Sequence, residues 1–172
     1  MFEIVSENHK PRLEADAALT ELDFRAVAGQ LGTPAVRARK ISYVAARQAE
    51  SEQVIDTRWN GKETTNIAHP GDWIVTNLSP ERKVLIDGEG NENTYVIAAD
   101  RFADLYEPAE EDGRVYRAKG VVEAIAVRGG FDIVAPWGER QMAPAGYLMF
   151  NGREVYGCHA EIFAATYEVV PA

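Results

Sequence analysis

The stretch "HPGDWIVTN" (residues 69–77) places a sharp turn directly before a strand. Pro70 fixes its own φ angle, Gly71 permits the positive φ of a tight turn, and Asp72 can accept hydrogen bonds from nearby backbone amides. Trp73 then opens a run of aromatic and β-branched residues, which is typical of a half-buried strand. The stretch therefore predicts a turn that leads into a sheet.

Three blocks of sequence recur in the same order, which predicts an internal duplication. The matching segments are 36–46 with 115–125, 71–77 with 145–151, and 94–108 with 155–169. In the last pair, Phe102 and Tyr106 correspond to Phe163 and Tyr167. Each aromatic pair is four residues apart and so shares one face of a short helix, which we expect to pack on a sheet.

We expect an α+β fold, with two pseudo-equivalent units of antiparallel strands and one short helix each. The units would share one core, because a unit of about 60 residues buries too little surface to be secure alone. An N-terminal helical arm would precede them, since Thr20 and Asp23 fit a capping box and Gly32 fits a C-cap. The predicted segments are a helical extension (1–35), a first unit (36–108) with a hairpin insertion (79–93), an acidic linker (109–114) and a second unit (115–172).

The composition excludes several classes of function. The 172 residues carry a net charge of -9, and a surface of that sign repels phosphate, so we expect no nucleic-acid partner. No apolar run approaches the roughly 20 residues needed to cross a bilayer, so we expect no membrane span. Cys158 is the only cysteine, which rules out an internal disulfide, and "MFEIVSENHK" (1–10) lacks a signal-peptide core. We therefore expect a cytoplasmic protein.

The well-defined catalytic and cofactor motifs are absent from the sequence. "GEGNEN" (88–93) lacks the last glycine of the dinucleotide fingerprint. "NGKETT" (60–65) lacks the upstream glycine of a phosphate-binding loop and the hydroxyl residue that should follow its lysine. We predict no cofactor and no metal site. Whether the protein is an enzyme stays open.

A group of candidate binding residues surrounds the turn: Arg58, Trp59, His69, Asp72 and Trp73. His69 and Asp72 could act as an acid/base pair or as metal ligands on a small polar or anionic substrate. In the alternative interpretation Asp72 fixes the turn and Trp73 belongs to the core. We favour a non-enzymatic binding or interaction module that uses the turn region of the first unit. The partner would be an unknown small ligand or protein, and the N-terminal arm could form a homo-oligomer.

Basic residues gather where the two matching units begin. Arg37, Arg39, Lys40, Arg117 and Lys119 lie in or beside the two opening strands. They could bind an anionic ligand, but basic residues at strand edges more often protect against aggregation.

The turn and the repeat together resemble the PGDYG-motif proteins and related short phage and prophage proteins. The resemblance rests on "HPGDWIVTN" followed by "RFADLY" (101–106), on the opening strand "VYRAKGVVEAIAV" (115–127) and on the closing helix "IFAATYE" (162–168). It covers most of residues 36–170. It implies a small α+β domain and no particular activity. The second unit departs from the motif, since it reads "PAGY" (144–147) and has no counterpart of the Asp72 carboxylate.

Overall fold

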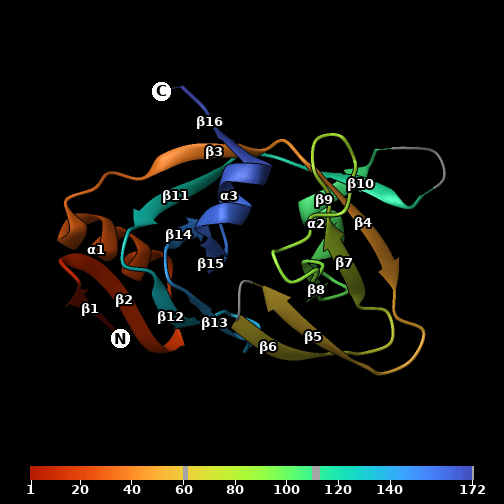
Figure 1. The fold of residues 1–172 in the computed structure, drawn as a ribbon, viewed down its shortest axis with the longest axis horizontal. Coiled ribbons are helices and arrows are strands. Elements are labelled where there is room, and N and C mark those ends of the chain that lie inside the picture. The colour runs from red at the N-terminus through yellow and green to blue at the C-terminus, as the bar shows by residue number, and fades with distance from the viewer. Residues whose placement is uncertain (60–61, 110–112, 172) are drawn as a thin grey trace. The chain divides into compact units, whose positions relative to one another are not determined.

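The computed structural model describes residues 1–59, 62–109 and 113–171. Strands make up 51% of the chain and helices 14%, so the fold is mostly β. Contacts within the chain divide it into two compact units. Unit 1 is Met1–Arg39 with Val121–Ala172, and unit 2 is Lys40–Gly120. In the sequence, unit 2 is therefore inserted into unit 1 (Figure 1).

Unit 1 contains two sheets and two helices. The larger sheet has the order β15-β14-β11-β3-β16, with bounds Val155–His159, Gly146–Phe150, Val122–Val127, Val36–Lys40 and Tyr167–Val169. The smaller sheet has the order β1-β2-β12-β13, with bounds Phe2–Glu7, Lys10–Ala18, Phe131–Val134 and Arg140–Ala143. Strands β2 and β12 are parallel, and the other neighbours in this sheet are antiparallel. The helices are α1 (Glu21–Leu31) and α3 (Ala160–Thr166).

The described residues of unit 2 form one five-stranded sheet, a two-stranded ribbon and one short helix. The sheet has the order β8-β7-β4-β10-β9, with bounds Thr94–Ile97, Trp73–Asn77, Tyr43–Gln48, Val115–Ala118 and Tyr106–Pro108. The ribbon consists of β5 (Gln53–Trp59) and β6 (Lys62–Ala68), which are antiparallel. Helix α2 (Phe102–Leu105) leads directly into β9.

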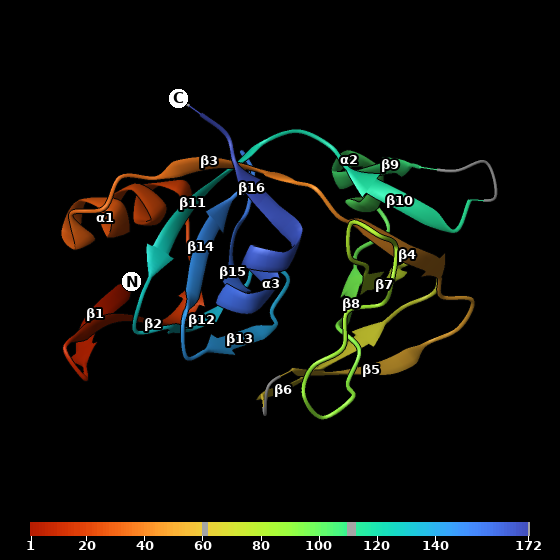
Figure 2. The same ribbon diagram turned by 45° about the horizontal axis from the view of Figure 1, so that its top comes forward.

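The two five-stranded sheets share one strand order. Strands β15, β14, β11, β3 and β16 take the places of β8, β7, β4, β10 and β9. The registers also agree, since Ala38 lies opposite Val122 in unit 1 and Tyr116 lies opposite Val44 in unit 2. The sheets differ in chain order, because the fourth strand comes first in unit 1 (β3) and last in unit 2 (β10), as Figure 2 shows. One sheet is therefore a circular permutation of the other.

The same aromatic stack joins the short helix to the sheet in both units. In unit 2, Trp73 stacks on Phe102 with ring centroids 4.0 Å apart, and Phe102 stacks on Tyr106 at 5.2 Å. The matching pairs in unit 1 are Tyr147–Phe163 at 3.8 Å and Phe163–Tyr167 at 5.1 Å. The expectation that these aromatic residues pack on a sheet is confirmed. The expectation that each pair shares one helix face is wrong, because Tyr106 and Tyr167 lie beyond the helices, at the starts of β9 and β16.

The first of the three matching sequence blocks is wrong by one residue. In the structure Ala46 lies opposite Val75, and Ala124 lies opposite Met149. Since Val75 and Met149 correspond, Ala46 corresponds to Ala124, and residues 36–46 match 114–124. A shift of one residue in a strand exchanges its two faces, so strand pairing and burial settle an alignment that residue identity left open.

The Pro-Gly-Asp turn lies at a bend in a long two-stranded ribbon. The pairing of β4 with β7 ends at Gln48↔Trp73, and the pairing of β5 with β6 resumes at Gln53↔Ala68. The two strands contribute equal numbers of residues to the bend, so the pairing register of β4 with β7 continues in β5 and β6. The predicted turn therefore redirects the chain from the sheet into the ribbon β5–β6.

The predicted α+β class with an N-terminal helical arm is wrong. Residues 2–18 form the hairpin β1–β2, whose turn at Asn8 and His9 has φ angles of 52° and 64°. A two-residue turn with both φ angles positive matches the twist of a hairpin, and asparagine tolerates this conformation. Within the predicted arm (1–35), only the helix after Thr20 was predicted correctly. Thr20 and Asp23 form its capping box, and Gly32 is its C-cap at φ 64°.

The predicted single core is also wrong. The described residues form four hydrophobic clusters, and each cluster lies within one unit. The largest belongs to unit 1, where Leu13 of β2 and Phe24 and Val27 of α1 are buried with Phe150. The N-terminal segment thus completes the core of unit 1. It buries the apolar side chains that a projecting arm would leave in water.

Close packing around Phe131 predicts a glycine requirement in unit 1. A Cβ atom on Gly157 would lie 2.5 Å from the Phe131 ring, whereas one on Gly29, inside α1, would meet nothing within 4 Å. We expect Gly157→Ala to lower the free energy of unfolding by about 1–3 kcal/mol through overpacking. Gly29→Ala should raise it by about 0.5–1 kcal/mol, because alanine favours a helix. Urea denaturation measures both, and equal effects would contradict the packing.

Candidate functional site

The carboxylate of Asp72 is bound to backbone amides at the bend. Its Oδ2 atom accepts the His69 N–H at 2.9 Å, and its Oδ1 atom accepts the Ala99 N–H at 3.0 Å. The main chain of the bend is also closed, since Ala49 N–H donates to the Asp72 carbonyl and Gly71 N–H donates to the Ala49 carbonyl, both at 2.8 Å. Asp72 therefore ties the bend to the segment that leads into α2.

Unit 1 satisfies the corresponding amide without a carboxylate. Ala160, which corresponds to Ala99, donates its N–H to the backbone carbonyl of Ala145 at 3.0 Å. The counterpart of Asp72 is Gly146, where a Cβ atom would lie 2.5 Å from the Cys158 carbonyl oxygen. The same amide is thus paired with a side chain in one unit and with the main chain in the other. Unit 1 therefore needs no acid in "PAGY", because the Ala145 carbonyl accepts the hydrogen bond of the Ala160 amide.

The other predicted binding residues do not gather around Asp72. Trp73 stacks on Phe102 and belongs to a core cluster. The imidazole of His69 is exposed, and its Nδ1 atom lies 3.8 Å from the Glu52 carboxylate, which is also exposed. Arg58 lies further along β5, and the side chain of Trp59 lies outside the described residues.

This arrangement gives little support to acid/base chemistry at the turn. Both oxygens of Asp72 already accept backbone hydrogen bonds, and His69 projects into solvent rather than into a cavity. Within the described ranges, no group of three histidine, cysteine or acidic residues could hold a metal ion. The prediction that His69 and Asp72 act together therefore rests on the sequence alone.

A hollow of about 440 Å³ lies against β5 in unit 2. Its lining consists of Asp56, Arg58, Ile86, Gly90, Asn91, Glu92 and Thr94. Arg58 and the predicted insertion 79–93 thus contribute to one surface. A volume of a few hundred Å³ is in the range of ordinary binding sites.

The segment beside this hollow is held in shape by Asp87. One carboxylate oxygen of Asp87 accepts the N–H groups of Glu89 and Asn91 at 2.9 and 2.8 Å, and the other accepts the Asn91 side-chain amide at 3.1 Å. Isolated bridges at Leu78↔Val84 and Ile86↔Glu92 replace the hairpin arm that the sequence suggested. The insertion is therefore an ordered loop that main-chain hydrogen bonds and the Asp87 carboxylate hold together.

Exposed apolar side chains continue this surface along the ribbon. Val54 and Ile67 lie opposite each other on β5 and β6 with 65% and 45% of their surface exposed, and Ile86 in the hollow is 58% exposed. Val54, Asp56 and Arg58 alternate along β5 and so face the same side. We call this surface, made of Val54, Asp56, Arg58 and Ile67 with residues 86–94, the ribbon face.

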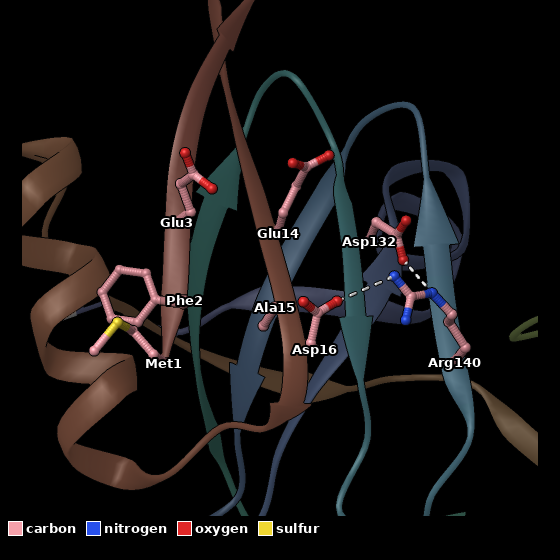
Figure 3. A pocket seen from close by; sticks show the side chains of 8 residues that line it. All are labelled: Met1, Phe2, Glu3, Glu14, Ala15, Asp16, Asp132 and Arg140. Atoms are coloured by element: carbon pink, nitrogen blue, oxygen red, sulfur yellow. Dashed lines mark ion pairs between the residues drawn. The ribbon is translucent and has the colours of Figure 1, made fainter.

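Unit 1 has a second hollow, of about 460 Å³, on the smaller sheet. Figure 3 shows Glu3, Glu14, Asp16 and Asp132 around it, with Arg140 reaching toward Asp132 and Asp16. The Arg140 Nε atom lies 2.7 Å from Asp132 Oδ1, and a second Arg140 nitrogen lies 3.9 Å from Asp16. Arg140 thus partly neutralises carboxylates that would otherwise repel one another across adjacent strands.

The predicted basic cluster separates into structural pairs. The guanidinium of Arg39 pairs with Glu168 in unit 1, and that of Arg117 lies 2.9 Å from Glu107 in unit 2. Lys40 donates to the Asn77 side chain at 2.9 Å and to the Tyr106 hydroxyl at 3.1 Å. The ion pairs join neighbouring strands, and β3 and β10 each lie between two other strands of their sheet. The strand-edge interpretation is therefore wrong, and the residues that form these pairs stabilise the sheets instead of forming an anion site.

His159 caps helix α3, whereas the sequence placed it at a helix start without assigning it a role. Its Nδ1 atom accepts the Glu161 N–H at 3.1 Å, and its Nε2 atom is buried without a partner among the described residues. Burial lowers the pKa of His159 below its usual value, and the nearby Glu161 carboxylate opposes this effect only in part. Its position one residue before a helix was the only signal in the sequence.

Comparisons with known proteins identify no relative of this chain. No family model, no curated protein and no solved structure matches it. Among the described helices, none is both long and apolar enough to span a bilayer.

The role of Asp72 can be tested by its removal. We expect Asp72→Ala to lower the free energy of unfolding by about 2–3 kcal/mol, because two backbone N–H groups lose a charged acceptor. His69→Ala should change it by less than about 0.5 kcal/mol, since that side chain is exposed. Chemical denaturation of both variants gives the comparison, and a larger loss for His69→Ala would contradict the assignment.

The His159 cap predicts a pH-dependent contribution to stability. Because the folded pKa lies below the usual value of 6.5, the unfolded chain binds the proton more readily. The contribution is therefore complete above about pH 6.5 and declines as the pH falls below it. His159→Asn keeps a capping acceptor but removes the titration. Between pH 7.5 and pH 5, we expect the variant to lose less unfolding free energy than the wild type. Equal losses of unfolding free energy in the wild type and the variant would refute the role of His159.

Proposed function

We propose that this protein is a non-enzymatic interaction module that binds a partner protein through the ribbon face of unit 2. The exposed apolar side chains of Val54, Ile67 and Ile86, set beside a hollow with charged and amide groups, carry this proposal. Apolar side chains that gather on a surface, with polar groups around them, are typical of protein interaction sites.

The charges beside this surface favour a partner with basic side chains. The hollow holds two carboxylates, Asp56 and Glu92, against one guanidinium, Arg58. The chain as a whole has a net charge of -9, which disfavours nucleic acid and favours positively charged proteins. A basic partner would also approach faster at low salt than at high salt.

The turn supports the ribbon face instead of forming the binding site itself. Asp72 and the Ala49 main chain fix the direction in which the ribbon leaves the sheet. His69 directly follows β6 and so lies at the base of the ribbon. The turn region predicted from the sequence therefore contributes to binding through the placement of β5 and β6.

The resemblance to PGDYG-motif proteins and the cytoplasmic location remain part of this proposal. The motif resemblance is supported by the Pro-Gly-Asp-aromatic turn and the short helix that follows it. The location is supported by Cys158, since a chain with one cysteine gains no internal disulfide from an oxidising compartment.

The proposal can be tested with a phage-displayed library of random peptides selected on the immobilised full chain. We expect selected peptides to bind the wild type, and to lose at least about tenfold in affinity for Val54→Ser/Ile67→Ser, because the apolar centre of the surface is removed. Leu22→Ser is the matched control, since Leu22 is an exposed apolar residue of unit 1. Failure to select any peptide, or equal losses in the two variants, would refute the proposed surface.

A further inference from the structure

The ribbon β5–β6 has a counterpart in unit 1, namely the hairpin β12–β13. The strands β11 and β14 continue into β12 and β13, as β4 and β7 continue into β5 and β6. Ala143 lies opposite Phe131 in the one and Ala68 lies opposite Gln53 in the other, and both alanines are buried. The two ribbons therefore correspond strand for strand, and β12 is the counterpart of β5.

In unit 1 the free edge of β12 is occupied by a strand of the same chain. Strand β2 runs parallel to it, with Leu13 opposite Phe131. The Gly129 N–H donates to the Pro11 carbonyl at 2.7 Å, and the Leu13 N–H donates to the Gly130 carbonyl at 3.0 Å. The Leu13 side chain is buried, with 1% of its surface exposed. An extended segment with an inward apolar residue thus completes this edge.

In unit 2 the corresponding edge of β5 has no strand beside it within the described ranges, because β5 and β6 form a sheet of two strands. The sequence of β5, "QVIDTRW", contains no proline or lysine, and its charged residues are Asp56 and Arg58. The hollow of about 440 Å³ lies between Asp56 and Arg58 of this strand and the loop 86–94. Room is therefore present beside this edge.

The pairing of β12 with β2 indicates which backbone groups of β5 would bind an added strand. In a parallel pair, the two residues that flank Phe131 direct their groups to β2, and Gly130 is seen to do so. Asp132 is the other flanking residue, and Val54 is its counterpart in β5. The Val54 N–H therefore faces the open edge, and its side chain lies on the exposed ribbon face.

We infer that the edge of β5 receives an extended segment of the partner protein, which adds parallel to β5 as β2 adds to β12. This inference rests on the proposed function and specifies its geometry. Inward-facing and outward-facing side chains alternate along this segment. Its inward side chains are apolar and meet Ile55 and Val96, which pack on the cluster beneath the ribbon. Its outward side chains include a basic residue that faces Asp56 and Glu92. Backbone hydrogen bonds supply affinity, and the alternating side chains supply selectivity.

The chain itself provides a probe for this edge. A synthetic peptide that copies residues 10–18, "KPRLEADAA", contains the segment that pairs with β12 and carries no net charge. It is titrated into the isotope-labelled full chain, and backbone amide shifts are followed by NMR. A peptide of the same composition in scrambled order is the control. We expect saturable shifts in residues 51–58 with the native order only.

Edge variants separate strand addition from general adhesion. Val54→Pro removes the N–H that faces the open edge, and we expect it to weaken peptide binding by about tenfold or more. Val54→Thr, which keeps the N–H and a β-branched shape, should bind within about twofold of the wild type. Ser51→Pro alters the counterpart of the Gly129 donor and serves as a second edge variant if Val54→Pro does not fold. Unchanged amide shifts elsewhere in unit 2 verify the fold of each variant.

Several results would overturn the inference. These are the absence of saturable shifts in residues 51–58, shifts confined to β12, or equal binding by Val54→Pro and the wild type. A wild type that dimerises in sedimentation experiments, together with a monomeric Val54→Pro, would assign the edge to a second copy of this chain.

The failure of the proposed function has a different signature. Library peptides could lose affinity for Val54→Ser/Ile67→Ser but not for Val54→Pro. This result would support the ribbon face as the binding surface and refute strand addition. If the library yields no binding peptide at all, the proposed function falls as well.

Discussion

Both five-stranded sheets depend on a fourth strand that pairs on both of its edges. In unit 2, β10 pairs with β4 on one side and with β9 on the other, and in unit 1, β3 lies between β11 and β16. Without this strand each sheet would divide into a three-stranded piece and one isolated short strand, and a single strand cannot satisfy its backbone groups alone. The chain supplies the fourth strand before the other strands in unit 1 and after them in unit 2. The two sheets thus share strand order and register, although the chain builds them in a different sequence.

At the bend of the long ribbon, the two units satisfy the corresponding backbone amide with different acceptors. The amide of Ala99, two residues after β8, and that of its counterpart Ala160 both need an acceptor. In unit 2 the Asp72 carboxylate accepts this hydrogen bond, whereas in unit 1 the Ala145 carbonyl does so. The backbone at Gly146 comes too close to Cys158 for any side chain. An acid present in only one of the two units can therefore be structural, because the other unit satisfies the corresponding amide by a closer backbone approach.

The ribbons beyond the bends are where the two units differ most. In unit 1, the ribbon is covered by β2 and contributes Phe131 to a large core. In unit 2, the ribbon has two strands, carries exposed apolar side chains and lies beside the ordered loop 79–93. Functions commonly lie on the parts that vary around a conserved scaffold. This difference is why we propose the β5–β6 ribbon, and neither core nor turn, as the interaction surface.

The sequence by itself determined the local features of this protein. The capping box at Thr20 depends on residues three positions apart, so their spacing was enough to predict it. The spacing of Phe102 and Tyr106 predicted that the two rings would meet, but it did not predict that Tyr106 lies in a strand. The tertiary structure alone decided which sheet each opening strand joins and that residues 2–18 pair as strands. It also decided that Asp72 holds an amide 27 positions away and that Arg58 lines a hollow with the loop 86–94. Such pairings are set by packing and by the backbone groups left without a partner, and no short pattern in one sequence records either.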